Sequence, residues 1–325
     1  MNRRQAIPKH LRYTINDFNK QFPDDDACLE YLKAERFPDG IAQCEKCGKE
    51  RKHYRVTGRP AYACDHCGKM ISPMAGTIFE HSSTSLRLWF YAMYLMFSTR
   101  CGISAKQIQR ETGVTYKTAW RMFRQIRSLL SEPDMQLEGD SVEMDESYFG
   151  PKRKRGEKRG RPSSDSSKQC AVGIVERKGR VVALTSENAT KQKLMSIATE
   201  RILPKSTVFT DEWAGYNDLE KAGYVHKRIP HAEKIYVAGD VHTQTIDGFW
   251  ALVKSGIRGV YHSVGKNYLQ TYLDEYSFRY NRRDRGNLIF TSALERISER
   301  SGESHVAERR RIALGKQAAS SPQPV

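Results

Sequence analysis

Residues 141–149 read Ser-Val-Glu-Met-Asp-Glu-Ser-Tyr-Phe, a β-prone run with Asp145 near its middle. A second β-prone run, residues 206–210 (Ser-Thr-Val-Phe-Thr), ends directly before Asp211. A third acid, Asp247, opens a helical pattern further along the chain. The sequence therefore predicts two strands and a helix that each deliver one aspartate.

The segments around these acids alternate between strand and helix patterns. Residues 170–175 and 181–184 predict two more strands, and residues 191–203 form an amphipathic helical pattern. Strand, strand, strand, helix, strand, helix is the order of an RNase H-like fold. In that fold the first acid lies mid-sheet, the second at the end of the neighbouring strand and the third on a later helix. We therefore expect an RNase H-like mixed-sheet catalytic core over residues 138–300, in a multidomain chain of mixed α+β and α/β class.

Three aspartates in this layout favour a site for divalent metal ions. Clustered carboxylates repel one another, and a bound cation relieves that repulsion. Two Mg²⁺ or Mn²⁺ ions sharing Asp145 would activate a water or a 3′-hydroxyl and stabilise the leaving oxygen. Asp211 and Asp247 would complete the two coordination shells. Lys254 follows Asp247 by seven residues, about two helical turns, so it lies on the same helix face and can bind a DNA phosphate.

The composition points to a nucleic-acid partner. The 325 residues include 54 Lys and Arg against 38 Asp and Glu, which gives a net charge of +16. Such a charge favours nucleic acid or an anionic membrane. The longest apolar run, residues 89–97, has about half the length that a membrane-spanning helix needs. Because the chain also begins without an apolar signal core, we expect a cytoplasmic, nucleoid-associated protein that binds double-stranded DNA and no membrane.

Two Cys-x-x-Cys pairs predict a zinc-ribbon module in residues 1–80. Cys44 and Cys47 form the first pair, and Cys64 and Cys67 form the second. Each pair places two thiolates on one tight turn, and the Gly that follows allows the backbone to bend. Four thiolates complete a tetrahedral shell for a structural Zn²⁺ ion. The alternative, two redox pairs, is disfavoured because no thioredoxin-like βαβ pattern surrounds them.

Residues 81–132 read as helices, and the second part of this region has a helix-turn-helix pattern. Ser104 can cap one helix, Gly113 ends it, and Thr115 can cap the next. The side chains on the helix that would enter the major groove are Tyr116, Lys117, Thr118 and Arg121. The alternative is an ordinary helical hairpin on the surface.

A basic loop, residues 151–168, lies between the first two predicted strands of the core. An extended cationic segment can follow phosphates or enter a narrow minor groove, whereas the alternative is a solvated charge run. The DNA contacts predicted here and near the end of the core are Lys152, Arg153, Arg155, Arg159, Arg161, Arg279 and Arg282. Residues 301–325 are polar and rich in Ala, Ser, Pro and Gln, which predicts a disordered tail.

The chain resembles the bacterial insertion-sequence transposases of the DDE type that carry an N-terminal zinc ribbon, the ISXO-like group. The resemblance runs from about residue 24 to about residue 283. It rests on both Cys-x-x-Cys pairs, on Lys254 and on the segments 72–79, 144–150, 210–212, 242–250, 259–262 and 278–282. It implies an RNase H-like core, Mg²⁺ dependence, binding of terminal inverted repeats, and DNA recombination by strand cleavage and strand transfer. Because joining needs two element ends together, we expect a homo-oligomer on DNA.

Two departures from that family concern the third acid. The family has Asn where this chain has Gln244, and Glu where it has Asp247. Asp is one methylene shorter, so its oxygens would lie about an ångström short of the metal, and such misplacement can reduce the rate on the order of 10²-fold. His242 and Gln244 are further candidate ligands, and Asp240 is a competing third acid.

Three interpretations therefore stand. The first is a DNA transposase. The second is a catalytically decayed copy that acts as a zinc-ribbon and helix-turn-helix DNA-binding protein, which the Asp247 departure favours. The third is a metal-dependent nuclease without strand transfer, which would need no sequence-specific binding of element ends.

Overall fold

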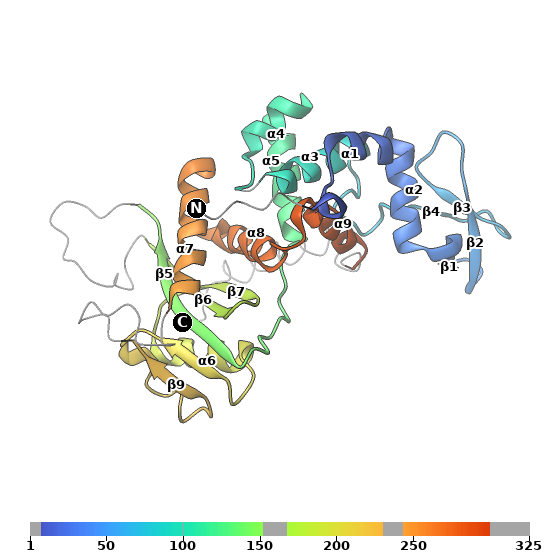
Figure 1. Cartoon of the computed structure of the whole chain (residues 1–325). Helices are drawn as coiled ribbons and strands as arrows, with labels where there is room; N and C mark the ends of the chain where they lie inside the picture. Colours follow the sequence, from blue (N-terminus) through green and yellow to red (C-terminus); the bar gives the residue numbers. More distant parts are fainter. Residues whose placement is uncertain (1–7, 100, 152–167, 230–242, 300–325) are drawn as a thin grey trace, which may run out of the picture. The chain divides into compact units, whose positions relative to one another are not determined.

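The computed structural model of the chain describes residues 8–99, 101–151, 168–229 and 243–299. The chain divides into two compact units, shown in Figure 1. The first unit runs to Leu129 and resumes at Arg285, and the second unit is Leu130–Asp284. The sequence predicts a catalytic core that spans residues 138–300. In the structure, residues 285–299 belong to the first unit. No helix among the described residues has the length and apolar content that crossing a membrane requires.

The first unit has a helical core. Its helices are α1 (Ile15–Gln21), α2 (Asp25–Arg36), α3 (Leu86–Ser98), α4 (Ala105–Thr112), α5 (Tyr116–Ser128) and α9 (Ile289–Glu299). α3 is buried along most of its surface, as its apolar sequence predicts. Phe290 of α9 contacts Phe18 and Phe22 at ring-centroid distances of 6.0 and 6.3 Å. Burial of these aromatic rings explains why the chain returns to the first unit after Asp284.

The first unit also contains a four-stranded antiparallel sheet in sequence order. Its strands are β1 (Ile41–Cys44), β2 (Lys49–Arg55), β3 (Tyr62–Cys64) and β4 (Met70–Ile71). Each strand pairs with the next one along the chain. β2 and β3 connect the first Cys-x-x-Cys pair to the second along the chain.

The second unit is built on a five-stranded mixed sheet. Its strands are β5 (Ser141–Phe149), β6 (Gln169–Glu176), β7 (Val181–Ser186), β8 (Thr207–Thr210) and β9 (Val225–Arg228). They lie in the order β7-β6-β5-β8-β9, so β5 is central. β5, β6 and β7 are antiparallel neighbours, whereas β8 and β9 extend the sheet in parallel with β5. The mixed sheet is thus as predicted, with β9 as an additional strand.

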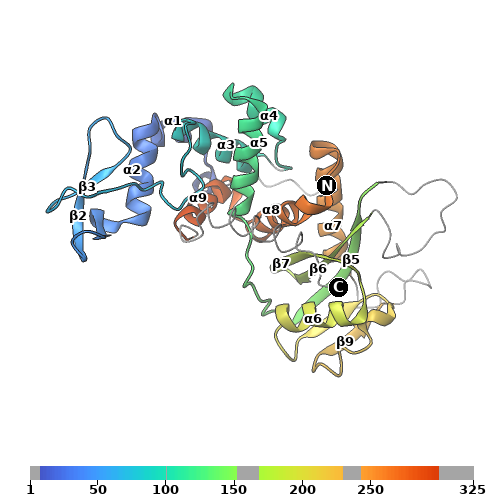
Figure 2. The same ribbon diagram turned by 180° about the vertical axis from the view of Figure 1, so that it is seen from behind.

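Helices cover both faces of this sheet, as Figure 1 and Figure 2 show. α6 (Lys191–Arg201) packs on one face, and α7 (Gln244–Gly256) with α8 (Leu269–Asn281) packs on the other. Alternation along β5 sorts its side chains between the two cores. Val142 and Met144 belong to the core beneath α6, and Phe149 packs against the core beneath α7. Asp145 is an even number of residues from Phe149, so it faces the α7 side.

α8 also covers the outer edge of β7. Among the described strands β7 pairs with β6 alone, so backbone groups along its other edge have no partner from those strands. Asn281 accepts from the Val181 N–H at 2.7 Å and donates to the Val181 carbonyl at 3.0 Å. Gln270 accepts from the Thr185 N–H at 2.7 Å and donates to the Ala183 carbonyl at 3.1 Å. Two side-chain amides therefore take the place of a neighbouring strand.

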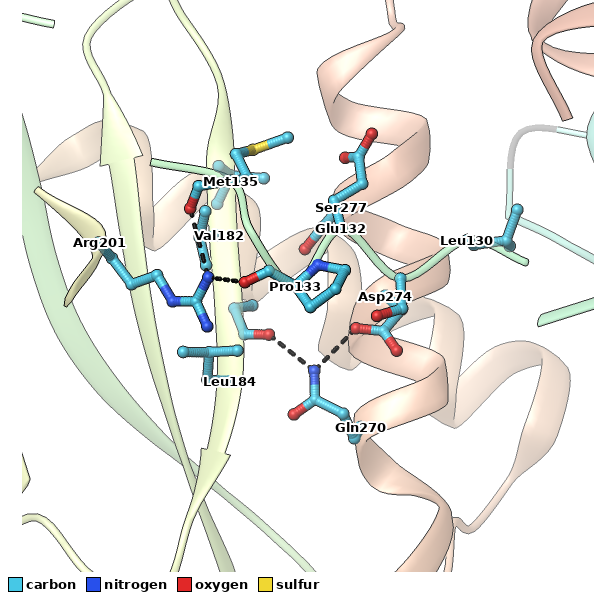
Figure 3. A pocket seen from close by; sticks show the side chains of 13 residues that line it. Leu130, Glu132, Pro133, Met135, Val182, Leu184, Arg201, Gln270, Asp274 and Ser277 are labelled. Atoms are coloured by element: carbon cyan, nitrogen blue, oxygen red, sulfur yellow. Dashed lines mark hydrogen bonds between the residues drawn. The ribbon is translucent and has the colours of Figure 1, made fainter. Parts of the chain in front are cut away.

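A cavity of about 160 Å³ lies beside this edge, between β7, α8 and residues 130–135 (Figure 3). Arg201 donates to the carbonyls of Pro133 and Met135, which ties the segment leading into β5 to the end of α6. The lining includes none of the aspartates predicted to be catalytic. The cavity therefore reflects how the entry segment packs and is separate from the predicted reaction site.

Candidate active site and metal-binding residues

The four cysteines predicted to bind zinc lie together at the two hairpin turns of the first sheet. The Sγ atoms of Cys44, Cys47, Cys64 and Cys67 all lie within 4.8 Å of one another. Cys44 Sγ is 3.6 Å from Cys67 Sγ, and Cys47 Sγ is 3.9 Å from Cys64 Sγ. A tetrahedron with Zn–S bonds of about 2.3 Å has S–S edges of about 3.8 Å. The four residues therefore fit a Zn²⁺ ion with little rearrangement.

Gly48 and Gly68 close the two cysteine turns, as expected. Their φ angles are +63° and +68°, and their N–H groups donate to the carbonyls of Cys44 and Cys64 at 2.8 and 3.1 Å. Glycine adopts this left-handed conformation without the steric penalty of a side chain. The backbone N–H of Cys47 lowers the pKa of Cys44 to about 6, which favours the thiolate that binds metal.

The sheet register places Asp145 and Asp211 side by side. β5 and β8 run parallel with Glu143 opposite Phe209, and the two aspartates follow two residues later on each chain segment. Neighbouring strands lie about 4.8 Å apart, so both carboxylates start from the same level of the sheet. Asp211 Oδ1 accepts from the Trp213 N–H at 3.0 Å, which fixes the turn directly after β8.

α7 brings Asp247 and Lys254 to the same region. Asp247 lies in the first turn of α7 and Lys254 in the last. Burial, and then the charges of Glu146, Asp211 and Asp247, raise the pKa of Asp145 to about 8. Burial also lowers the pKa of Lys254, and the charges of Asp145 and Asp247 oppose that change. The four residues predicted from the sequence are therefore electrostatically linked, with negative charge concentrated around Asp145.

The close approach of α7 to the sheet depends on Gly173, the register partner of Asp145 on β6. A methyl group at Gly173 would lie 2.6 Å from the Trp250 ring and 2.9 Å from Ile246. The missing side chain thus lets α7 lie directly on the strand pair that carries Asp145. Phe249 and Trp250 are buried there as core residues.

The carboxylates are spaced more widely than the thiols. Within the described part of the chain, the cysteines are the one group of three or more potential ligands whose donor atoms all lie within 4.8 Å of one another. Asp145 and Asp211 are partly buried, whereas Asp247 is exposed. The donor set, three carboxylates, is chemically suited to Mg²⁺ or Mn²⁺. The wide spacing accords with the shorter reach of Asp at the third position.

α4 and α5 form the predicted helix pair with the predicted ends. Ser104 accepts from the Gln107 N–H at 3.2 Å, and Thr115 accepts from the Thr118 N–H at 3.2 Å. Gly113 adopts φ +71° between the helices. The buried residues between them include Ile108, Ala119 and Met122.

The four residues of α5 that are predicted to contact DNA differ in how exposed their side chains are. Tyr116 and Lys117 are exposed at the start of α5, and Thr118 is partly exposed. Arg121 is partly buried; it donates to Ser82 Oγ at 3.2 Å, and its guanidinium lies 5.7 Å from the centre of the Trp89 ring. The first turn of α5 therefore offers the more accessible part of the predicted interface.

Arg279 and Arg282, which the sequence predicts to contact DNA, both pair with acids of the second unit. Arg279 is only 7% exposed, and its Nη2 lies 2.7 Å from Oε1 of the fully buried Glu275. Arg282 bonds Glu132 at 2.8 Å and lies 3.8 Å from the centre of the Phe278 ring. The sequence revealed the two charges but not the acids that neutralise them inside the fold.

Several predicted residues lie outside the described part of the chain. These are Lys152, Arg153, Arg155, Arg159 and Arg161 of the basic loop, the competing acid Asp240, the candidate ligand His242, and the tail 301–325.

Two glutamates beside Asp145 were not singled out from the sequence. Glu143 is fully buried and bonds the first turn of α7. Glu146 is 9% exposed and accepts from the Tyr216 hydroxyl at 2.6 Å. The available clue was the presence of three acids in a strand predicted to lie inside the sheet, because a charged residue is buried there only with a partner.

Comparison with known proteins assigns the family. Residues 136–281 match the family model of the ISXO2-like transposase domain. Residues 23–70 match the family model of the transposase zinc-ribbon domain. The chain therefore carries an ISXO2-like transposase domain preceded by a transposase zinc-ribbon domain. The first match contains all four residues of the predicted catalytic group, and the second contains all four cysteines. The resemblance drawn from the sequence motifs is thereby confirmed.

Relatives of this transposase carry related names. It is 29% identical over 277 residues to a protein in transposable element ISH50 of Halobacterium salinarum, and the match covers 80% of this chain and 92% of that protein. It is 26% identical over 104 residues to a transposase-like protein of Haemophilus influenzae, with 32% of this chain and 83% of that one covered. A pre-cleavage Mos1 transpososome structure matches with 13% identity and a TM-score of 0.27, over 65% of this chain and 76% of that one. So low a TM-score does not bear on the fold.

Proposed function

We propose that this transposase binds the terminal inverted repeats of an insertion sequence and performs metal-dependent strand cleavage followed by strand transfer. The observation that carries the proposal is the accumulation of carboxylates around Asp145, where burial, and then the charges of Glu146, Asp211 and Asp247, raise the pKa to about 8. Such a cluster is unfavourable alone and favourable around divalent cations. The β7-β6-β5-β8-β9 order supports an RNase H-like core, with Asp145 on its central strand.

The residues have distinct roles in the proposed reaction. Divalent cations, when bound, would supply charge neutralisation and an activated oxygen nucleophile. Asp145 lies between Asp211 on the neighbouring strand and Asp247 on α7, so it is the carboxylate best placed to be shared. Lys254 offers a cation to a DNA phosphate beside the acids. Because Asp145 holds its proton up to a pH of about 8, metal binding would release that proton.

Several regions of the chain would hold DNA. The net charge of +16 supports binding to the phosphate backbone. In a helix-turn-helix of α4 and α5, Tyr116 and Lys117 would enter the major groove from the exposed start of α5. The zinc ribbon and the basic loop 151–168 would add contacts. Joining requires two element ends, so we further propose a homo-oligomer assembled on DNA.

The second candidate function is DNA binding by a catalytically decayed copy. It is favoured by the exposed Asp247, whose shorter side chain replaces the glutamate of the family, and by the wide spacing of the acids. In this case the α4–α5 pair and the zinc ribbon would still recognise DNA, while the acid cluster would fail to hold its metals.

The deciding experiment measures strand cleavage and joining on DNA that carries the flanking element ends, with Mg²⁺ and with Mn²⁺. The unaltered chain should cleave and join, and Asp145→Ala should do neither while keeping its DNA affinity. Activity found only in Asp247→Glu would identify a decayed copy. Cleavage without joining, together with equal affinity for random and terminal-repeat DNA, would identify a nuclease.

A further inference from the structure

We propose that the two glutamates flanking Asp145 on β5 are positioning residues for the acid cluster. Glu143 holds the start of α7, which carries Asp247, and Glu146 holds the turn after β8, which carries Asp211. The inference rests on the proposed function, because it concerns the geometry of the same three aspartates.

Glu143 takes the place of a helix cap at the start of α7. The first N–H groups of any helix lack partners within it, and an N-cap side chain normally accepts from them. The N-cap residue of α7, Thr243, makes no such bond. Instead, Glu143 Oε2 accepts from the N–H groups of Thr245 and Ile246 at 2.8 and 3.0 Å. Glu143 Oε1 accepts from the Thr245 hydroxyl at 3.0 Å.

The carboxylate of Glu143 is itself held in one place. Its side chain is fully buried, and Oε1 lies 3.1 Å from Arg177 Nε. The Arg177 guanidinium lies 3.8 Å from the centre of the Phe209 ring, so it too is packed. An ion pair and two helix-end N–H groups compensate the burial of the charge. The cap is therefore a fixed link between β5 and α7.

This link sets the separation of two of the three acids. Glu143 and Asp145 are two residues apart on a strand, so they point to the same face. Ile246, which donates to Glu143, directly precedes Asp247. A shift of the helix start would thus move Asp247 relative to Asp145 by a similar amount, and metal ligands tolerate little displacement.

Glu146 provides the corresponding link on the other face of β5. Its Oε2 accepts from the hydroxyl of the fully buried Tyr216 at 2.6 Å. The Tyr216 N–H donates to the Trp213 carbonyl at 3.1 Å, and the Trp213 N–H donates to Asp211 Oδ1 at 3.0 Å. Three hydrogen bonds, joined through the residues Tyr216 and Trp213, therefore connect Glu146 to Asp211.

The chain offers matched controls for both links. Glu176 on β6 is 8% exposed and accepts from the N–H groups of Glu138, Gly139 and Arg180 at 2.8, 3.1 and 2.8 Å. These bonds hold residues 138–139 ahead of β5 and the turn between β6 and β7, not the start of α7 or the turn after β8. The buried Tyr224 hydroxyl donates to the carbonyls of Ala198 and Ile202, which is the matching control for the Tyr216 hydroxyl.

The test measures Mn²⁺ binding to the full chain by isothermal titration calorimetry, counting only the binding that Asp145→Ala abolishes. Removing groups that orient metal ligands typically weakens metal affinity about 10- to 100-fold. We expect a loss in this range for Glu143→Gln and for Glu143→Asp, with zinc content and DNA affinity unchanged. Glu143→Asp keeps the negative charge and shortens the side chain by one methylene. A loss of Mn²⁺ affinity in this variant would therefore come from the position of the carboxylate and not from its charge.

The second link is tested with Tyr216→Phe, which removes a single oxygen and should also weaken Mn²⁺ binding. The controls Glu176→Gln and Tyr224→Phe should lower the melting temperature and leave Mn²⁺ affinity unaltered. If the Glu143 variants do not fold, Thr245→Val removes only one of the three bonds from α7 to Glu143 and should still weaken Mn²⁺ binding.

Affinity equal to that of the unaltered chain in folded Glu143→Asp, Thr245→Val and Tyr216→Phe would overturn the positioning roles and leave the proposed function standing. A loss of affinity as large in the two controls would also overturn them, because it would reflect general destabilisation. An unaltered chain that neither binds Mn²⁺ nor cleaves DNA would instead overturn the proposed function, and this inference with it.

Discussion

Replacing Asp145 with Asn should stabilise the metal-free transposase while abolishing cleavage. Burial, and then the charges of Glu146, Asp211 and Asp247, raise the pKa of Asp145 from 3.8 to about 8. The folded chain therefore keeps a proton that the unfolded chain releases between these two values. Proton uptake on folding makes the free energy of unfolding fall as pH rises from about 4 to about 8. Asn has nearly the same shape and no charge, so it escapes this penalty.

The size of the effect follows from the same pKa values. One pKa unit corresponds to about 1.4 kcal/mol, so a rise from 3.8 to about 8 sets an upper limit of about 6 kcal/mol. Asp145 is only partly buried, and water and salt screen its repulsion with the other acids. We therefore expect Asp145→Asn to raise the free energy of unfolding of the second unit by about 1 to 3 kcal/mol at pH 8. The gain should shrink toward pH 5.

Hydrogen exchange of peptides from β5 and β6, together with thermal unfolding, would measure this change in the second unit by itself. The buffer should contain no Mg²⁺ and no chelator, so that the zinc site stays intact. Adding Mg²⁺ should make the unaltered chain more stable than Asp145→Asn, because a ligand stabilises only the chain that binds it. Asp134→Asn removes an exposed acid of the same unit and controls for net charge. A variant no more stable than the unaltered chain at pH 8, or stability of the unaltered chain that does not change with pH, would refute this reasoning.

Three further changes test other parts of the molecule. Removing Zn²⁺ with a chelator should unfold the four-stranded sheet and lower DNA affinity in a mobility-shift assay; unchanged affinity would exclude a docking role for the ribbon. Gly173→Ala places a methyl group 2.6 Å from the Trp250 ring, so it should destabilise the second unit by about 1 to 3 kcal/mol and reduce cleavage. Full activity of that variant would contradict the tight fit of α7. Lys117→Gln should weaken DNA binding and reduce its salt dependence by about one ion, whereas Arg279→Gln should lower the melting temperature and leave the salt dependence alone. A reduced salt dependence of DNA binding in Arg279→Gln, with an unchanged melting temperature, would mean that Arg279 contacts DNA.

Local chemistry explains why much of the fold could be predicted. Ser104, Gly113 and Thr115 end and begin helices by bonds within a few residues, so their roles are visible in the sequence. The cysteine turns are also local, since each is closed by the glycine that follows it. The positions of Asp145 and Asp211 required one further step, the pairing of β5 with β8, which the order of strands and helices supplied.

The parts that were not predicted depend on partners far away in the chain. The amphipathic pattern of α9 says that one face is buried, but not that it packs on Phe18 and Phe22 rather than on the core of the second unit. Similarly, nothing near Arg282 in a linear pattern reveals its ion pair with Glu132, which lies 150 residues earlier in the chain. Long-range packing decides both cases, and a single sequence does not encode that choice locally.

The three acids of β5 show how surroundings, rather than residue type, separate the roles of similar side chains. Glu143 meets an arginine and the N–H groups of a helix end, so its charge is neutralised within the protein. Glu146 meets a buried hydroxyl. Burial, and then the charges of other carboxylates, raise the pKa of Asp145, and the backbone N–H of Glu146 offsets only part of this rise. An acid surrounded in this way gains most from a cation that the protein itself does not provide. Asp145 is therefore the position at which metal binding would relieve the greatest repulsion, while its two neighbours hold the other ligands in reach.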